Sequence, residues 1–231
     1  MRSEDCRVGG SILLPKFIYV LAAVLFISAE APFAAPEDLS GYWEPLIMED
    51  FILRTQGVKK GDYNGIELND LARTAADHFK PDAGKDELLL DKCGPHGAPR
   101  VMFTATRLHI TQNDREITME LEAEGQIRRF YLDSRDWPGG ELQWQGHSIA
   151  YEEGDGLLTV ITRHLRPGLL RSNGVPYSEE AVLTEHYTRH GDYFTVIQAV
   201  EDPKYLQAPF ITSTSFHRIS KPDDWRMGSC R

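Results

Sequence analysis

From about residue 101 onward, apolar and polar residues alternate with a period of two, and this pattern constrains the fold more than any other feature of the sequence. It is clearest in Ile117 to Leu121, Ile127 to Tyr131 and Leu158 to Thr162. A period of two places successive side chains on opposite faces of a β-strand. Weaker patterns predict further strands at 101–110, 142–151, 181–189, 194–200 and 210–219. The chain is therefore expected to be mainly β.

Short segments rich in Gly, Asn and Asp separate these strands. They contain Asn113-Asp114, Gly125, Pro138-Gly139-Gly140, Gly154-Asp155-Gly156 and Gly191-Asp192. Strands joined by tight turns run antiparallel. We therefore predict an all-β fold, an up-and-down antiparallel β-barrel, with a β-sandwich as the alternative.

One helical pattern precedes the strands. Apolar residues recur at helical spacing between Asn69 and Phe79, and Pro81 follows them. The expected body of the protein is thus a single domain, residues 36–231, in which one short N-terminal amphipathic helix precedes the barrel.

Residues 1–35 have the composition of a signal peptide or an N-terminal anchor. Lys16 precedes an apolar run from Phe17 to Ile27, and small residues follow. The run is shorter than the about 20 apolar residues that a membrane-spanning helix needs. Ala29-Glu30-Ala31 offers a cleavage site, but Pro32 would hinder the peptidase, so an uncleaved anchor stays open. The sequence predicts export to the periplasm, with secretion or membrane tethering as alternatives.

The net charge of −10 limits the partners that we expect. An acidic surface repels nucleic acid and anionic lipid, so we expect no nucleic-acid partner and membrane contact only through an uncleaved N-terminal segment. The chain lacks the motifs of nucleotide-binding enzymes, serine hydrolases and zinc or calcium sites. We therefore expect no metal and no cofactor.

Cys93 and Cys230 are the cysteines of the predicted exported body. In an oxidising compartment a disulfide between them would tie the C-terminal tail to an upstream loop. Two unpaired thiols are the alternative.

The candidate catalytic residues centre on the strand predicted at 181–189. The face that carries Glu185 and Tyr187 is the more apolar one, so we place it inside the barrel. There Glu185 could serve as general acid or base beside the Tyr187 phenol. A structural ion pair with an arginine is the alternative. Arg100, at the end of a Gly/Pro-rich loop, is the expected partner, either of Glu185 or of a ligand carboxylate.

His147 follows Trp144-x-Gly146 within the strand predicted at 142–151, and His164 ends the neighbouring predicted strand. If both face inward, they could form an acid–base pair near neutral pH; histidines of the barrel rim in contact with solvent are the alternative. Arg128 and Arg129 are adjacent, so only one of them can reach the interior.

The candidate ligand-binding residues are aromatic or cationic side chains that an interior cavity could present. An eight-stranded barrel encloses room for about one small ligand. The tryptophans among these residues could instead be simple core residues. The candidates are Trp43, Trp144, His164 and Arg129.

Several short motifs together resemble a group of exported bacterial proteins of unassigned function. They are Ser40 to Trp43, Cys93 to Arg100, Trp144 to Ser148, Glu153 to Leu157, Ser178-Glu179, Glu185 to Tyr187 and Asp202-Pro203. Gly41-x-Trp43 also resembles the lipocalin signature, whose tryptophan closes the barrel base beneath a ligand cavity. The resemblance implies a calycin/lipocalin-like barrel and no particular activity.

The function expected from the sequence is the binding of an apolar or aromatic small molecule. One hypothesis adds a cofactor-independent lyase or isomerase step. In it, Glu185 or His147 moves a proton while Arg100 and Tyr187 stabilise negative charge on the substrate. A non-catalytic carrier or sensor, and a structural envelope protein with a filled barrel, are the alternatives.

Overall fold

The computed structural model describes residues 38–55, 58–63, 65–80, 96–123, 125–134, 136–137, 139–154 and 156–228. The chain divides into two units, Met1–Pro32 and Phe33–Arg231, and every described residue belongs to the second. The predicted signal segment and both cysteines of the predicted disulfide, Cys93 and Cys230, lie outside the described residues.

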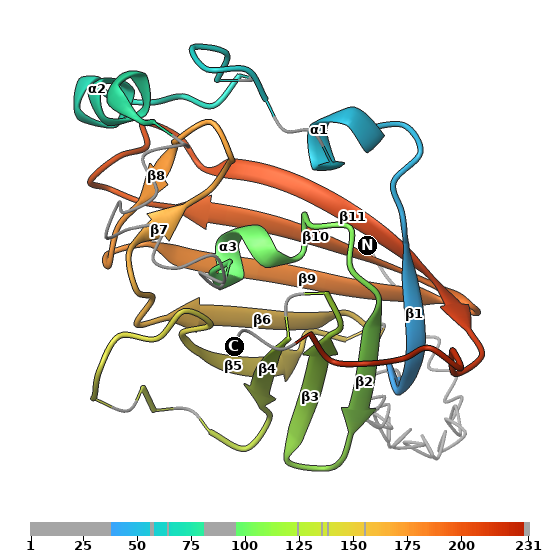
Figure 1. Ribbon diagram of the computed structural model, residues 1–231. Helices are drawn as coiled ribbons and strands as arrows, with labels where there is room; N and C mark the ends of the chain where they lie inside the picture. Colours follow the sequence, from blue (N-terminus) through green and yellow to red (C-terminus); the bar gives the residue numbers. More distant parts are fainter. Residues whose placement is uncertain are drawn as a thin grey trace, which may run out of the picture. The chain divides into compact units, whose positions relative to one another are not determined.

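Nine strands of the described residues close into a barrel in the order β1-β11-β10-β9-β6-β5-β4-β3-β2 (Figure 1). Their bounds are β1 (Gly41–Leu46), β2 (Leu108–Gln112), β3 (Glu116–Leu121), β4 (Gln126–Tyr131), β5 (His147–Glu152), β6 (Leu158–Arg163), β9 (Val182–His190), β10 (Tyr193–Glu201) and β11 (Phe210–Ile219). A separate two-stranded sheet contains β7 (Gly168–Leu169) and β8 (Pro176–Tyr177). The predicted barrel is confirmed, and the β-sandwich alternative is wrong.

Most strand pairs are antiparallel, but β4 and β5 run parallel, with Phe130 opposite Ser148. The segment 132–146, which contains the predicted turn at Pro138-Gly139-Gly140, therefore leads the chain from the end of β4 back to the start of β5. A tight turn cannot make this return, because it joins only antiparallel strands. The expectation of an entirely antiparallel barrel was wrong at this one pair.

The barrel closes through β1, which the alternation pattern did not predict as a strand. It pairs antiparallel with β11 on one side and with β2 on the other. Its hydrophobic side chain inside the barrel is Trp43, which has no exposed surface.

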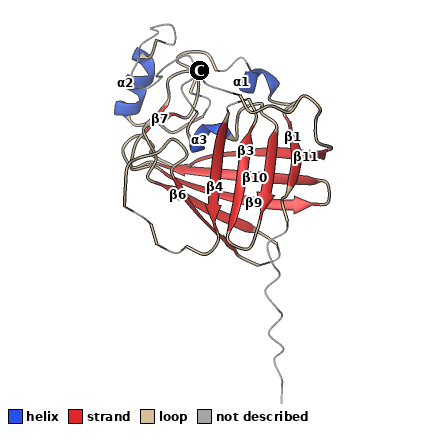
Figure 2. Cartoon of the chain, turned by 60° about the horizontal axis from the view of Figure 1, so that its bottom comes forward, coloured by secondary structure: helices blue, strands red, loops and turns tan. Residues whose placement is uncertain are grey.

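Helices α1 (Phe51–Thr55), α2 (Asp70–His78) and α3 (Ala98–Val101) lie at one end of the barrel, which we call the covered end (Figure 2). Helix α2 occupies the segment with the helical pattern, and Asn69 caps it by accepting a hydrogen bond from the Ala72 amide at 2.9 Å. Helix α3 replaces the start of the strand predicted at 101–110, because Pro99 sits in its first turn, where proline favours a helix. No helix of the described residues is both long and apolar enough to cross a membrane.

The barrel interior is filled by aromatic side chains. The rings of Trp43 and Phe194 meet edge to face at 4.8 Å, and Phe216 stacks on Phe194 at 4.7 Å. These three side chains, with Phe130 and Tyr187, are at most 1% exposed. Because these five side chains pack against one another, the predicted ligand cavity does not lie between them.

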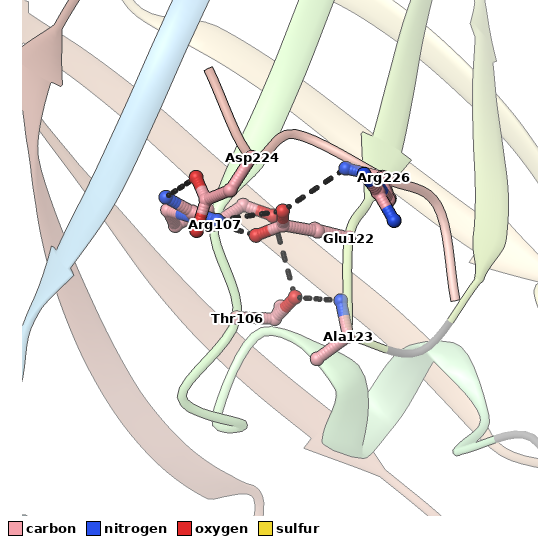
Figure 3. A network of polar contacts seen from close by, with 6 residues as sticks. All are labelled: Thr106, Arg107, Glu122, Ala123, Asp224 and Arg226. Carbon is pink, nitrogen blue, oxygen red and sulfur yellow. Dashed lines mark hydrogen bonds and ion pairs between the residues drawn. The ribbon is translucent and has the colours of Figure 1, made fainter. Parts of the chain in front are cut away.

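After β11 the chain crosses the outside of the barrel and binds the β2–β3 hairpin (Figure 3). Arg107 donates to both carboxylate oxygens of Glu122, at 2.5 and 2.7 Å, and to Asp224 at 3.1 Å. The Gly228 amide donates to the Glu122 carbonyl at 2.7 Å. Residues 222–228 are therefore fixed to the barrel by polar contacts.

Candidate functional site

Glu185 is buried inside the barrel and is held by Arg128, not by Arg100. Both side chains have no exposed surface. Nη1 and Nη2 of Arg128 donate to the two carboxylate oxygens at 2.8 and 2.5 Å, which is a bidentate ion pair. The expectation that Glu185 pairs with an arginine was right, but the partner was wrong. Arg100 belongs to α3 at the covered end, whereas β4 and β9 both turn their side chains into the same interior.

Two further groups donate to the same carboxylate. The Tyr187 hydroxyl donates to Oε1 of Glu185 at 3.1 Å, and Nε2 of Gln198 donates to the same oxygen at 3.2 Å. Burial, and then the negative charge of Glu185, raise the pKa of Tyr187 well above its usual value, so the phenol stays neutral. The predicted Glu185–Tyr187 contact is therefore present. It is one of four hydrogen bonds that the Glu185 carboxylate accepts.

His147 lies on the outer face of the barrel, so the expectation that it faces inward was wrong. Its neighbour Ser148 points inward and bonds Thr162 of β6 at 2.8 Å, and alternate residues of a strand face opposite ways. The Tyr131 ring stacks on His147 with centroids 4.8 Å apart. Burial, and then the nearby His164, lower the pKa of His147.

The structure does bring His147 and His164 together, around Trp137. The indole ring meets both imidazoles edge to face, at 5.9 and 6.5 Å, and Arg163 lies 5.2 Å above it. His164 has a φ of 56°, a conformation that is strained for a residue other than glycine. An acid–base pair here would act on the outer surface rather than inside a cavity.

The structure places Trp43 in the core. Its Nε1 donates to the Leu39 carbonyl at 2.8 Å, and Arg218 lies 4.5 Å above its ring. With no exposed surface, Trp43 is a core residue of the barrel.

Arg129 points away from the interior. Its side chain is 48% exposed and pairs with Glu116 at 2.8 Å. Of the two adjacent arginines, Arg128 is the one that enters the barrel. The choice of Arg129 failed because the apolar pattern of Ile127 and Tyr131 identifies the outer face of β4, while Arg128 shares the inner face with Phe130.

Trp144 lies at the covered end, next to α3. Its carbonyl accepts a hydrogen bond from the Ala98 amide at 3.0 Å, and Arg166 lies 5.1 Å above its ring. The following residue, Gln145, donates through Nε2 to the His96 carbonyl at 2.8 Å and also to Oε1 of Gln126.

Several side chains at this end carry buried polar atoms that have no hydrogen-bond partner among the described residues. They include Oε1 of Gln145, Nε2 of Gln126, Nε of Arg171 and the Tyr177 hydroxyl. Tyr177 is 1% exposed, and its hydroxyl packs against Gly97 so closely that a Cβ at Gly97 would lie 1.8 Å from it. Glycine is therefore required at this point of contact.

Arginines surround the same region. Arg171 is 5% exposed and lies 3.5 Å from the ring centre of Phe103 and 4.8 Å from that of Phe210. Burial, followed by the positive charges of Arg54 and Arg100, lowers the pKa of Arg171 to about 10. Arg100 also acts on the pKa of Tyr177, so it lies near both side chains.

We call Arg100, Gln126, Gln145, Arg171 and Tyr177 the covered-end site. Of these, the sequence singled out only Arg100, as a ligand or ion-pair partner. Arg171 and Tyr177 lie in a Gly/Pro-rich stretch without periodicity, so no local signal marked them. Among the described residues no group of three or more His, Cys, Asp or Glu side chains could hold a metal ion.

No protein-family model matches this chain, and no curated protein matches it either. The resemblance to exported bacterial proteins therefore stays a prediction.

Proposed function

We propose that this protein is an exported small-molecule-binding barrel of the calycin/lipocalin-like kind, acting as a carrier or sensor. Its ligand is an apolar or aromatic compound with polar groups, and it binds at the covered end. Export is supported by the sequence of residues 1–35. The calycin-like assignment is supported by Gly41-x-Trp43 at the start of a strand that closes the barrel.

The observation that carries the proposal is the set of buried, unpartnered polar atoms on Gln126, Gln145 and Tyr177. A buried donor or acceptor that makes no hydrogen bond costs about 1–3 kcal/mol, and folded proteins keep few of them. Three such groups at one end of the barrel are best accounted for by a molecule that supplies the missing partners. The rings of Phe103 and Phe210 beside Arg171 supply apolar contact for the rest of the ligand.

Binding without catalysis is favoured over a lyase or isomerase step. The Glu185 carboxylate accepts hydrogen bonds from Arg128, Tyr187 and Gln198, and none of these four side chains is more than 1% exposed. A general base must reach the proton that it removes. Glu185 is enclosed by its own partners, which suits a structural role.

Native mass spectrometry of the gently purified full chain tests this proposal. We expect a small molecule that stays bound under native conditions and leaves on denaturation. Titration of that molecule should change tryptophan fluorescence, because Trp144 lies beside the site. Tyr177→Phe should weaken binding about five- to tenfold through one lost hydrogen bond.

The control is Tyr193→Phe, at a tyrosine that is 55% exposed at the start of β10. It should bind as the unchanged protein does. A protein that carries only water and shows no response to a broad panel of apolar compounds would favour the structural envelope alternative instead.

A further inference from the structure

We infer that the ligand of the covered-end site is an organic acid whose carboxylate binds Arg171. This inference deepens the proposed function and rests on it. It names the class of the ligand, an aromatic or alicyclic monocarboxylate, and the side chain that selects it.

Arg171 is a buried cation for which the described part of the chain supplies no paired anion. Among the described residues no carboxylate lies within ion-pair distance of its guanidinium, and its Nε has no hydrogen-bond acceptor. Buried charges in proteins are normally paired, because removing an ion from water is costly. The contacts of the Arg171 guanidinium with Phe103 and Phe210 are cation–π contacts, which leave its donors unused.

The surrounding charges favour an anion at this position. Arg54 and Arg100 are close enough to disfavour the charge of Arg171, whereas the nearby acid, Asp50, is bound to Arg54 at 2.6 Å. Arg171 therefore meets repulsion from neighbouring cations inside a protein whose net charge is −10. A carboxylate bound here would offset the positive charge of Arg171. The rest of the surface is acidic, so it would not attract the same carboxylate.

The geometry selects a carboxylate with an apolar body. A guanidinium presents paired N–H donors that match the two oxygens of a carboxylate. The Tyr177 hydroxyl, which is buried and unpartnered, can donate to a polar atom of the same molecule. The rings of Phe103 and Phe210 beside Arg171 offer apolar surface to the rest of the molecule.

The test compares acids with their neutral amides on the full chain. Calorimetric titrations use benzoate, 1-naphthoate and 4-phenylbutyrate, each beside its primary amide. At least one acid should bind about ten- to a hundredfold more tightly than its amide, which is the range of a charge-assisted hydrogen-bonded pair. Arg171→Met should abolish this preference, while Arg129→Met, at an arginine on the outer face, should keep it.

Thermal unfolding without ligand gives a second readout. Methionine keeps the length and apolar contact of the Arg171 side chain but removes its unpaired charge, so Arg171→Met should unfold at an equal or higher temperature than the unchanged protein. A lower temperature, or failure of both Arg171→Met and Arg171→Lys to fold, would show a structural cation–π role and overturn the inference.

The outcomes separate this inference from the proposed function. Equal binding of acid and amide overturns the inference and leaves small-molecule binding intact. No binding by any of the acids also overturns it, and the proposed function is then decided by the native mass spectrum alone.

Discussion

Two buried arginines, Arg128 and Arg171, differ in what surrounds them. Arg128 meets a carboxylate in bidentate geometry, and Tyr187 and Gln198 complete the set of donors around that carboxylate. Arg171 meets aromatic rings and other arginines. Since both side chains are shielded from water, the charge of Arg128 is compensated by its own carboxylate, whereas the proposed ligand would compensate that of Arg171.

Glu185→Gln tests the structural role of the ion pair. The substitution leaves Arg128 charged and buried without a counter-ion, so we expect the free energy of unfolding to fall by about 3–5 kcal/mol. Urea unfolding followed by circular dichroism measures this change.

The double variant Arg128→Met with Glu185→Gln is the matched comparison. It removes both charges, so it should recover more than half of the lost stability. An unchanged urea midpoint for Glu185→Gln alone would contradict the structural role and reopen a catalytic one.

At the scale of elements, the return segment 132–146 sets the environment of His147. It carries Trp137, whose ring meets the His147 imidazole edge to face, while Tyr131 of β4 stacks on the same imidazole. This enclosure, together with the nearby His164, is why the pKa of His147 is lowered.

The lowered pKa predicts a pH dependence of stability. The folded protein binds this proton less readily than the unfolded chain does, whose ordinary histidine pKa is 6.5. The free energy of unfolding should therefore be unaffected by His147 above pH 6.5 and should fall as the pH drops below that value toward the lowered pKa.

Urea unfolding across this pH range, for the unchanged protein and for His147→Gln, checks the prediction. In the variant, the free energy of unfolding should fall less below pH 6.5 than it does in the unchanged protein. His190→Gln, at an exposed histidine that ends β9, should keep the full fall. Parallel curves for the unchanged protein and His147→Gln would contradict the prediction.

At the scale of the whole molecule, the C-terminal segment 222–228 contacts barrel residues that lie far from it in the sequence. Asp224 binds Arg107 (Figure 3). The Trp225 ring meets Tyr42 edge to face at 5.2 Å. The strand pairings that close the barrel do not involve this segment.

A chain that ends at Lys221 should therefore still form the barrel. We expect it to lose about 1–3 kcal/mol, from the aromatic contacts of Trp225, the exposed Arg107–Asp224 ion pair and the hydrogen bond from Gly228 to Glu122. Hydrogen exchange at the β2–β3 hairpin should become faster, whereas exchange in β9 and β10 should not change.

Cys230→Ser is the matched control for this truncation, because it keeps the segment and removes only the thiol. Stability equal to that of the unchanged protein would show that the segment is held by its contacts. A loss as large as that of the truncation would instead favour the predicted Cys93–Cys230 disulfide.

The alternation of residues in single strands was readable without the structure, because each strand's backbone places successive side chains on opposite faces whatever surrounds it. Ile117, Met119 and Leu121 of β3, and Glu185 and Tyr187 of β9, are buried as their patterns predict. The segment around α2 was readable for the same reason, since its cap and its apolar spacing are local.

The tertiary structure alone decided which distant residues meet. Arg128 and Glu185 are separated by 57 positions, and their pairing follows from closure of the barrel. The same closure places Arg128, and not the expected Arg129, inside the barrel. The parallel β4–β5 pair likewise depends on where the segment 132–146 returns. Periodicity reports the geometry of one element, so the sequence by itself determined the strands of the barrel. Charge pairing and the covered-end site arise between elements, so only the tertiary structure decided them.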